Sequence, residues 1–320
     1  MTRYAIRRIA LVVPSAFAAS LVVFAVMRAL PGDVVLAILA DTPHTVEIRE
    51  ALREQLGLNE PLVTQYFTWV ASLLTGEMGG VSLETGEPIG HIVSGQLSVT
   101  LLLAGYAVVI SIAVALPLSI AAAGREGKPA GRAIEGFALV SLSVPTVFAA
   151  LLLMWLLLRL VGWSPPIIYL GPTEDLREHL EMMVWPAVLL ALAYLPVLIR
   201  VTRARLTDVL ESDYSASARA RGLSERGVIL RHALPNALIA LVTMVGLQFG
   251  SLVSGALVVE TVFGLPGLGR GIVHAALSRD YPVVQTMAIV LVVTVLAMNL
   301  VVDLICAAID PRVRYERRQA

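Results

Sequence analysis

Residues 212–235 read SDYSASARARGLSERGVILRHALP, a polar, arginine-rich segment between two long apolar runs. A protein that only sits in lipid or only conducts has little use for such a segment. Its small side chains, concentrated at residues 216–220, let the backbone of a partner approach closely, and its arginines can fix the partner's position. We therefore expect a docking element through which a soluble protein pushes on membrane helices.

The composition of the chain is that of a membrane protein. Of its 320 residues, 57% are hydrophobic and 15% are charged, and the mean hydropathy is +0.80. Soluble domains carry about a quarter charged residues. The net charge of zero provides no global field that would attract nucleic acid. The single cysteine, Cys306, rules out a disulfide within one chain, and the scattered histidines lack metal-ligand spacing.

Six segments approach the roughly 20 apolar residues that a transmembrane helix needs. The fourth contains Pro186 and Pro196. Because backbone groups freed by proline must be satisfied by neighbours in lipid, this span should be kinked and packed against other helices. The first apolar run exceeds the roughly 7–15 residues of a signal peptide, so we expect an uncleaved span. The predicted spans are residues 9–30, 97–123, 134–161, 182–199, 238–259 and 283–309.

The distribution of basic residues predicts the orientation, because cytoplasmic loops carry an excess of lysine and arginine. With the N-terminus inside, most basic residues fall in cytoplasmic segments, and Arg28 and Arg159 lie at span ends. Both termini and residues 212–235 are therefore expected in the cytoplasm. The external segments keep only Arg49, Arg53, Arg177, Arg270 and Arg279.

The first external segment, residues 31–96, is long and acidic. Residues 45–56 have amphipathic helical spacing with Gly57 as a stop, and residues 61–74 fit a second short helix that ends near Gly76. Two interpretations stay open. The segment is either a lid that caps the helices or a surface for an extracytoplasmic partner, since a loop of this length is rarely without use.

Within residues 212–235 the local signals predict two short helices. Ser212 is a plausible N-cap, and Gly222 is a helix stop. Ser224 caps a second helix, which is expected to run from Glu225 to Pro235, where the fifth span begins. The alternative is a loop whose arginines only set topology and bind anionic lipid headgroups.

The spacing of this segment resembles the EAA loop of permease subunits of ABC importers. Gly222 and the Leu-Pro pair at 234–235 have the required separation, and residues 216–218 occupy the E-A-A position. Ala216 replaces the glutamate, and His232 replaces a hydrophobic residue. The sequence of residues 213–226 resembles instead that of the dipeptide/oligopeptide/nickel branch, in which an acidic residue usually precedes a tyrosine.

The resemblance extends over nearly the whole chain and is to first-subunit, or B-type, members of that branch. Residues 260–269, ETVFGLPGLG, are the most specific match. The other matching strings are RALPGD at 28–33, LREQLGL at 52–58, SLSVP at 141–145, RDYPVVQ at 279–285 and DPR at 310–312.

The resemblance implies an all-α, six-span type I ABC importer permease fold. Its expected segments are a cytoplasmic N-terminus at 1–8, a first transmembrane helix at 9–30, an external helical loop at 31–96, a five-helix core at 97–309 with a cytoplasmic coupling loop at 200–235, and a cytoplasmic tail at 310–320.

The resemblance also implies partners in the bacterial inner membrane. They are a homologous second permease, two cytoplasmic ATPases that bind the coupling loop, an external substrate-binding protein and the lipid bilayer, with no nucleic acid. ATP and magnesium would be bound by the ATPases, and this chain would hold no cofactor or metal. The expected coupling residues are Asp213, Tyr214, Ala216, Ala218, Arg219, Arg221, Gly222, Leu223, Glu225 and Arg226, and those of the external gate are Glu260, Phe263, Pro266, Gly267 and Gly269.

Polar residues inside spans are candidates for the translocation path. Gln248 and Asn299 are such candidates, although hydrogen bonds between helices explain each equally well. Asp303, near the inner end of the sixth span, is expected to pair with an arginine.

The chain lacks a G-x-x-x-x-G-K-[ST] loop and an HExxH motif, so we expect no ATP hydrolysis or metalloprotease activity in it. The glycines at 267–271 predict a tight turn or re-entrant hairpin, not a dinucleotide site. Two alternatives remain, namely a stand-alone secondary transporter, which would need intramembrane carboxylates such as Glu260 or Asp303, and a membrane scaffold without a path.

Overall fold

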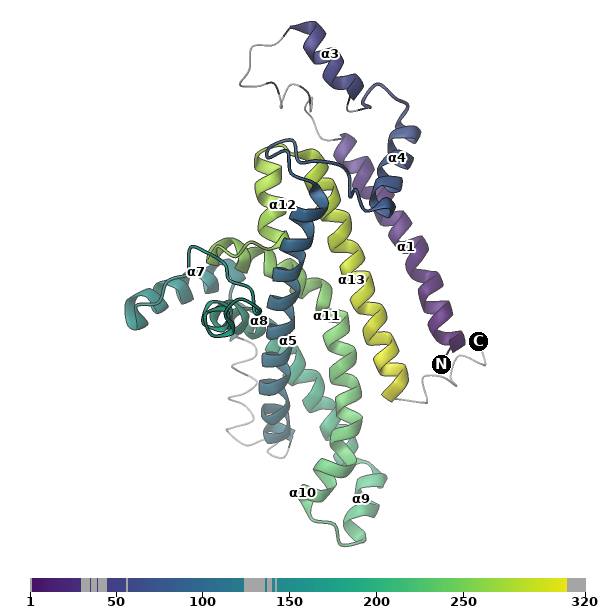
Figure 1. The fold of residues 1–320 in the computed structure, drawn as a ribbon. Coiled ribbons are helices and arrows are strands. Elements are labelled where there is room, and N and C mark those ends of the chain that lie inside the picture. Colours follow the sequence, from purple (N-terminus) through teal and green to yellow (C-terminus); the bar gives the residue numbers. More distant parts are fainter. Residues whose placement is uncertain are drawn as a thin grey trace. The chain divides into compact units, whose positions relative to one another are not determined.

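A computed structural model describes residues 2–29, 35, 39, 45–55, 57–123, 136, 140–141 and 143–309. Within these ranges all the elements of regular secondary structure are helices, as Figure 1 shows. The elements are α1 (Thr2–Ala29), α3 (Val46–Gln55), α4 (Leu62–Thr75), α5 (Ile89–Ala123), α7 (Thr146–Leu156), the π-helical η1 (Leu157–Val161), α8 (Leu176–Glu211), α9 (Asp213–Ala220), α10 (Glu225–Val228), the π-helical η2 (Ile229–Ala233), α11 (Leu234–Phe263), α12 (Leu268–Leu277) and α13 (Tyr281–Ile309).

Five described helical segments are long and apolar enough to cross a membrane. They lie in α1, α5, α8, α13 and the continuous run from Glu225 to Phe263. The third predicted span, 134–161, is represented by the shorter apolar run Thr146–Val161, and most of its earlier part lies outside the described residues. The six-span prediction is compatible with this arrangement. Arg125, Lys128 and Arg132, which belong to the cytoplasmic excess of basic residues, and the arginines of the tail at 310–320 also lie outside the described ranges.

The fourth span is much longer than the predicted 182–199. Helix α8 begins at Leu176, where the carboxylate of Asp175 accepts hydrogen bonds from the backbone N–H groups of Arg177 (2.9 Å) and Glu178 (3.0 Å). It continues through Pro186 and Pro196, and both prolines are buried. Its apolar stretch is 67% buried, a larger share than in the other four segments, so the expected packing against other helices is confirmed.

The long external segment contains the predicted short helices. Helix α3 ends before Gly57, whose φ of +63° is a left-handed conformation that favours glycine. Helix α4 starts after Pro61 and ends at Gly76, which has a φ of +89°. Leu56, the last residue of the first predicted helix, lies outside the described residues.

The chain divides into two compact units. Unit 1 comprises Met1–Arg8, Leu101–Leu265 and Ala297–Ala320, and unit 2 comprises Ile9–Thr100 and Pro266–Leu296. The division differs in kind from the predicted segments, which follow membrane topology, because it cuts through α1, α5 and α13. Each unit is described by itself below.

The core of unit 1 forms where α8 packs against α11. One buried cluster includes Leu195, Ile199 and Leu241, and another joins Leu206 to Ala233 at the ends of these helices. Helices α11 and α13 approach closely at Gly246, where an added Cβ atom would lie 2.4 Å from Cγ1 of Val302.

Unit 2 is organised by the buried carboxylate of Asp280, which precedes α13. Its Oδ2 accepts hydrogen bonds from the hydroxyl of Ser82 (2.5 Å) and from the backbone N–H groups of Leu83 (3.0 Å) and Glu84 (3.3 Å). Its Oδ1 accepts a longer bond from the N–H of Val283 (3.4 Å). One side chain therefore holds the turn before α5 and the first turn of α13 together.

Gly246→Ala should destabilise the protein, because the new methyl group overlaps Val302 at a contact between two helices. Overpacking of this kind costs about 1–3 kcal/mol. The matched control is Gly105→Ala in the middle of α5, where an added Cβ meets nothing within 4 Å. Thermal unfolding of the detergent-solubilised chain should show a lower midpoint for Gly246→Ala only. Equal midpoints would contradict the close approach.

Asp280→Asn should loosen the turn at residues 82–84, because the neutral amide loses the charge-assisted acceptance of several N–H and O–H groups. Hydrogen exchange of the peptide that contains residues 82–87 should become faster, roughly tenfold for the loss of one charged hydrogen bond. Asp175→Asn is the control, since asparagine caps a helix as well as aspartate. Unchanged exchange in Asp280→Asn would show that the carboxylate does not hold this turn.

Candidate functional site

The segment 212–235 folds as a hairpin of two short helices at one end of α11 (Figure 1). Helix α8 stops at Glu211, and Ser212 is extended, with a φ of −71° and a ψ of 154°. Ser212 lies at the N-cap position of α9, as predicted, but its side chain does not form the capping hydrogen bond. The hydroxyl of Ser212 donates backwards to the carbonyl of Val209 at 2.6 Å and caps no N–H group of α9.

Gly222 ends α9 as predicted, and the reason is visible in its backbone. Its φ of +84° is left-handed, its N–H donates to the carbonyl of Arg219 (2.8 Å), and the N–H of Leu223 donates to that of Ala218 (3.3 Å). This pair of bonds is a Schellman motif, which satisfies the last carbonyls of a helix and reverses the chain.

The second helix continues directly into the fifth span. Ser224 caps α10 by accepting a hydrogen bond from the N–H of Gly227 at 3.3 Å, as expected. The expected end at Pro235 is wrong, because α10 passes through the π-helical η2 into α11 without a break. Pro235 lies in the first turn of α11, where the wider π-helical turn before it accommodates a residue that has no N–H.

Arg219 connects the two helices of the hairpin. Its guanidinium donates from Nε to Oε1 of Glu225 (2.7 Å), from Nη2 to Oε2 (3.3 Å) and from Nη1 to the carbonyl of Leu210 (2.9 Å). The hydrogen bond to Glu225 raises the pKa of Arg219, although desolvation opposes it. The expected part of Arg219 and Glu225 in coupling to an ATPase stays a prediction. They pair with each other and tie α9 to α10 and to the end of α8.

A second contact across the hairpin joins Tyr214 to His232. The phenol oxygen lies 2.7 Å from Nδ1 of the imidazole, and the two rings are edge-to-face at 5.0 Å. The sequence marked His232 only as a departure from the pattern. Its partnership with Tyr214 was missed, since the two residues become neighbours only after the chain reverses at Gly222.

The hairpin has one buried and one exposed face. Ala218, predicted to admit a partner's backbone, is fully buried within the chain, as is Ser215, whose hydroxyl donates to the carbonyl of Val209 in α8 at 2.6 Å. Gly222 and Arg226 are exposed, and Leu223 is half-buried. The face that is free for a partner is formed by Asp213, Ala216, Ser217, Ala220 and Arg221.

The residues of the predicted external gate are divided between two elements. In unit 1, Glu260 and Phe263 are buried at the end of α11, which stops at Gly264 with a φ of +71°. In unit 2, Pro266 is exposed, whereas Gly267 and Gly269 are buried at the start of α12. The tight turn or re-entrant hairpin predicted at 267–271 is wrong, because α12 begins at Leu268 and the non-helical turn lies at residues 264–267.

Helix α12 is fixed within unit 2 by its first residues. The backbone N–H of Leu268 donates to the hydroxyl of Thr100 at 2.9 Å. A Cβ atom on Gly271 would collide with the side chain of Gln96. The close packing of α12 on α5 accounts for a glycine at this position of the motif.

The two predicted path residues lie on different helices of unit 1. Gln248 is half-buried and borders a small space together with Ser111, Tyr194 and Leu252. Asn299 is exposed on α13. Among the described residues no hydrogen bond joins Gln248 to Asn299, and their role in a path stays a prediction.

Asp303 pairs with an arginine, as expected. Its Oδ2 lies 2.9 Å from Nη1 of Arg8, and Nη2 of Arg8 donates to its Oδ1 at 3.0 Å. This two-point contact ties the first turns of α1 to the last turns of α13.

Comparisons with known proteins identify the family. Residues 115–315 match the family described as binding-protein-dependent transport system inner membrane component, and residues 1–113 match its N-terminal counterpart. The chain is 32% identical to the oligopeptide transport system permease protein AppB of Bacillus subtilis, over 98% of this chain and 100% of the relative.

Two further relatives are similar over their whole length. The dipeptide transport system permease protein DppB of Alkalihalophilus pseudofirmus is 34% identical, with 98% of this chain and 100% of the relative covered. The glutathione transport system permease protein GsiC of Escherichia coli is also 34% identical, with 99% and 100% covered.

Among solved structures, the fold is similar to a chain of the MetNI methionine ABC transporter in an inward-facing conformation. The TM-score is 0.59 at 18% sequence identity, and the match covers 70% of this chain and 99% of that one. The chain belongs to the binding-protein-dependent transport system inner membrane component family, and it is a non-catalytic, multi-pass inner-membrane permease subunit with the fold of a type I ABC importer.

Proposed function

We propose that this chain is a permease subunit of an ATP-driven importer of dipeptides, oligopeptides or related small ligands. The relatives named for oligopeptide, dipeptide and glutathione transport support this substrate class. The observation that carries the mechanism is the hairpin of α9 and α10, which presents small side chains outward and is continuous with a membrane span.

The hairpin is built to transmit a push. Arg219 ties α9 to Glu225 in α10 and to Leu210 at the end of α8, so a force on α9 reaches α8 and α11 together. The run from α10 through η2 to α11 has no flexible linker. Closure of two ATPases would therefore rock these spans between inward-open and outward-open states, a rigid-body transition.

The exposed face of α9 supports a groove-binding mode of recognition. Ala216, Ser217 and Ala220 leave room for a partner's backbone, while Asp213 and Arg221 flank them with opposite charges. Short helices that dock into grooves are a recurring recognition mode. We propose that each of two cytoplasmic ATPases binds such a face, one on this chain and one on a homologous second permease.

The remaining partners and the orientation are part of the same proposal. The excess of arginine near the hairpin supports a cytoplasmic hairpin and cytoplasmic termini. The acidic segment 31–96 and the turn at 260–271 would then meet an external substrate-binding protein. ATP and magnesium would be bound by the ATPases.

A stand-alone secondary transporter is the second candidate, and the ion pair of Asp303 argues against it. Such a transporter needs an intramembrane carboxylate that changes its charge during transport. Asp303 is held by two contacts to Arg8. A scaffold without a path would not need an exposed docking face continuous with a span.

Ala216→Trp should abolish coupling, because a large ring on the exposed face of α9 keeps the ATPase from approaching. In proteoliposomes that contain the whole complex, uptake and substrate-stimulated ATP hydrolysis should fall at least roughly tenfold, the effect of losing about 1.4 kcal/mol of binding. Ala204→Trp, on an exposed position of α8, is the matched control. Normal uptake in Ala216→Trp would contradict the docking face.

Gly222→Ala should weaken the hairpin through its backbone alone, since an added Cβ meets no atom within 4 Å but the φ is +84°. Left-handed backbone costs an L-residue about 1–2 kcal/mol. Gly227→Ala, within α10 of the same hairpin, has no such penalty and should behave as wild type. The ratio of uptake to ATP hydrolysis should fall for Gly222→Ala only. Equal ratios in the two variants would contradict the proposal that the hairpin transmits movement to the spans.

A further inference from the structure

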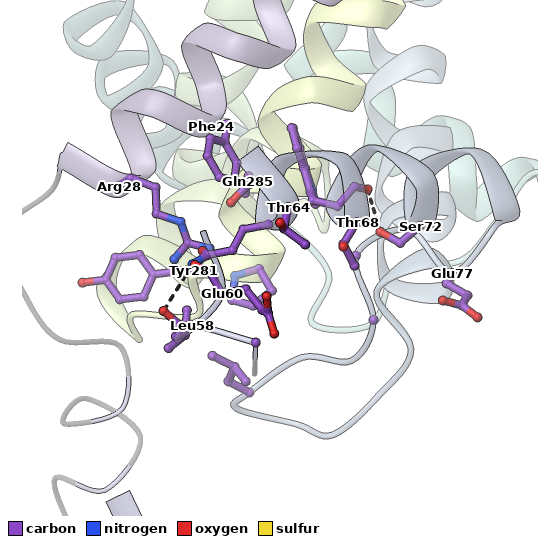
Figure 2. A pocket seen from close by; sticks show the side chains of 17 residues that line it. Phe24, Arg28, Leu58, Glu60, Thr64, Thr68, Ser72, Glu77, Tyr281 and Gln285 are labelled. Carbon is purple, nitrogen blue, oxygen red and sulfur yellow. Dashed lines mark hydrogen bonds between the residues drawn. The ribbon is translucent and has the colours of Figure 1, made fainter. Parts of the chain in front are cut away.

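A cavity of about 410 Å³ lies within unit 2. The proposed coupling mechanism assigns no role to the residues that line it. Figure 2 shows its walls, with Phe24 and Arg28 from the end of α1, Thr64 and Thr68 from α4, and Tyr281 from the start of α13. Two of these walls are the ends of membrane-spanning helices. We therefore expect the cavity at the depth where a bilayer's hydrocarbon meets its headgroups.

Within the part of the chain that the structure describes, two buried polar atoms of the lining have no hydrogen-bond partner. They are the indole Nε1 of Trp69, a donor, and the amide Oε1 of Gln65, an acceptor. The other end of the Gln65 amide is occupied, since its Nε2 donates to the carbonyls of Glu60 (2.7 Å) and Leu58 (3.2 Å). Buried polar groups are almost always paired, so an unpaired donor and acceptor in one cavity point to a ligand.

Charged groups of both signs accompany these atoms. The guanidinium of Arg28 lies over the ring of Phe24, 5.3 Å from its centroid, and pairs with no carboxylate among the described residues. Glu60 and Glu77 are exposed and also line the cavity. The site thus offers a cation and a donor to an anion, and carboxylates and an acceptor to an ammonium group.

Helix α4 forms a wall that faces two environments. Toward α1 it places Tyr66, which is buried and shares a 2.7 Å hydrogen bond with Ser20. Away from α1 it exposes Val63 (68%), Phe67 (60%) and Leu74 (83%), at helical spacing. No residue of α4 is charged. An uncharged helix with an exposed apolar stripe and tryptophan at its inner face fits the membrane interface.

We propose that this cavity binds the headgroup of a phospholipid that carries a primary ammonium group. The phosphate accepts hydrogen bonds from Arg28 and from Nε1 of Trp69, because guanidinium groups bind phosphate by two parallel bonds. The ammonium donates to Oε1 of Gln65 and faces the carboxylates of Glu60 and Glu77. The acyl chains leave along the apolar stripe of α4.

Other ligands match fewer of these features. A free phosphate would leave the acceptor of Gln65 and both carboxylates unused. A soluble zwitterionic peptide offers the same two charges, but it gives the exposed apolar residues of α4 nothing to contact. The bound lipid would hold α4 against α1 at the membrane surface.

The test measures lipid retention and needs no transport, so its outcome is independent of the proposed import function. The full-length chain, purified with its co-purifying subunits, is incubated with equal amounts of ethanolamine, choline and glycerol phospholipids that share the same acyl chains. Native mass spectrometry then counts the lipids that remain bound. We expect the ethanolamine lipid to be retained in preference to the other two.

Variants assign this retention to the cavity. Arg28→Gln should lower retention roughly tenfold, the effect of losing a charge-assisted hydrogen bond. Trp69→Phe keeps the ring and removes only the N–H, and it should give a smaller loss in a protein that folds normally. Arg177→Gln changes an exposed arginine of unit 1 and should retain lipid as wild type does.

Three outcomes would overturn the proposal. The first is equal retention by wild type, Arg28→Gln and Trp69→Phe. The second is equal retention of the glycerol lipid, which would remove the role of the carboxylates. The third is displacement of the lipid by a soluble dipeptide that Arg28→Gln no longer binds, which would make the cavity a peptide site.

Discussion

In hydrocarbon every backbone N–H and C=O group must find its partner within the protein, and this constraint accounts for the plan of the molecule. The apolar runs become helices because a helix satisfies its own backbone. Several reversals of the described chain satisfy their backbone groups in a specific way. At Gly222 and Gly264 a left-handed glycine satisfies the last carbonyls, and at Asp280 a buried carboxylate collects N–H groups of a turn.

In the coupling hairpin, at the polar ends of α8 and α11, polar groups also find their partners within the chain. Its side-chain contacts join parts of the hairpin to each other and to α8, since Arg219 binds Glu225 and Leu210, and Tyr214 contacts His232. Small side chains and flanking charged ones are exposed on the outer face of α9. The internal hydrogen bonds keep the hairpin rigid, and the small exposed side chains let a partner bind it closely. Such a hairpin can transmit a displacement of the partner to α8 and α11. The rigidity of the hairpin and its exposed docking face therefore depend on different residues of the same short segment.

Hydropathy and spacing predicted most of the helices but misjudged where some of them end. The fourth span was predicted as 182–199, whereas α8 covers Leu176–Glu211, because its ends carry charged residues that hydropathy scores as loop. The caps at Ser224 and Gly222 follow from local chemistry and were predicted correctly. Ser212 was not, since Val209, one turn earlier, offers its hydroxyl a carbonyl acceptor that no local rule weighs. Ala218 looked like part of a docking face until the packing of α9 buried it.

The sequence by itself determined the class of the molecule, the approximate spans, the glycine reversals and the family, because these depend on composition and on residues close together in the chain. Only the tertiary structure decided which arginine ties the two helices of the hairpin together, since Arg219 reaches Glu225 and Leu210 whereas Arg221 donates to the carbonyl of Ser217 one turn earlier. It also decided that α10 runs unbroken into α11, and that Arg28, Gln65 and Trp69 line one cavity. Those facts depend on which side chains a folded chain brings together, and no local pattern contains them.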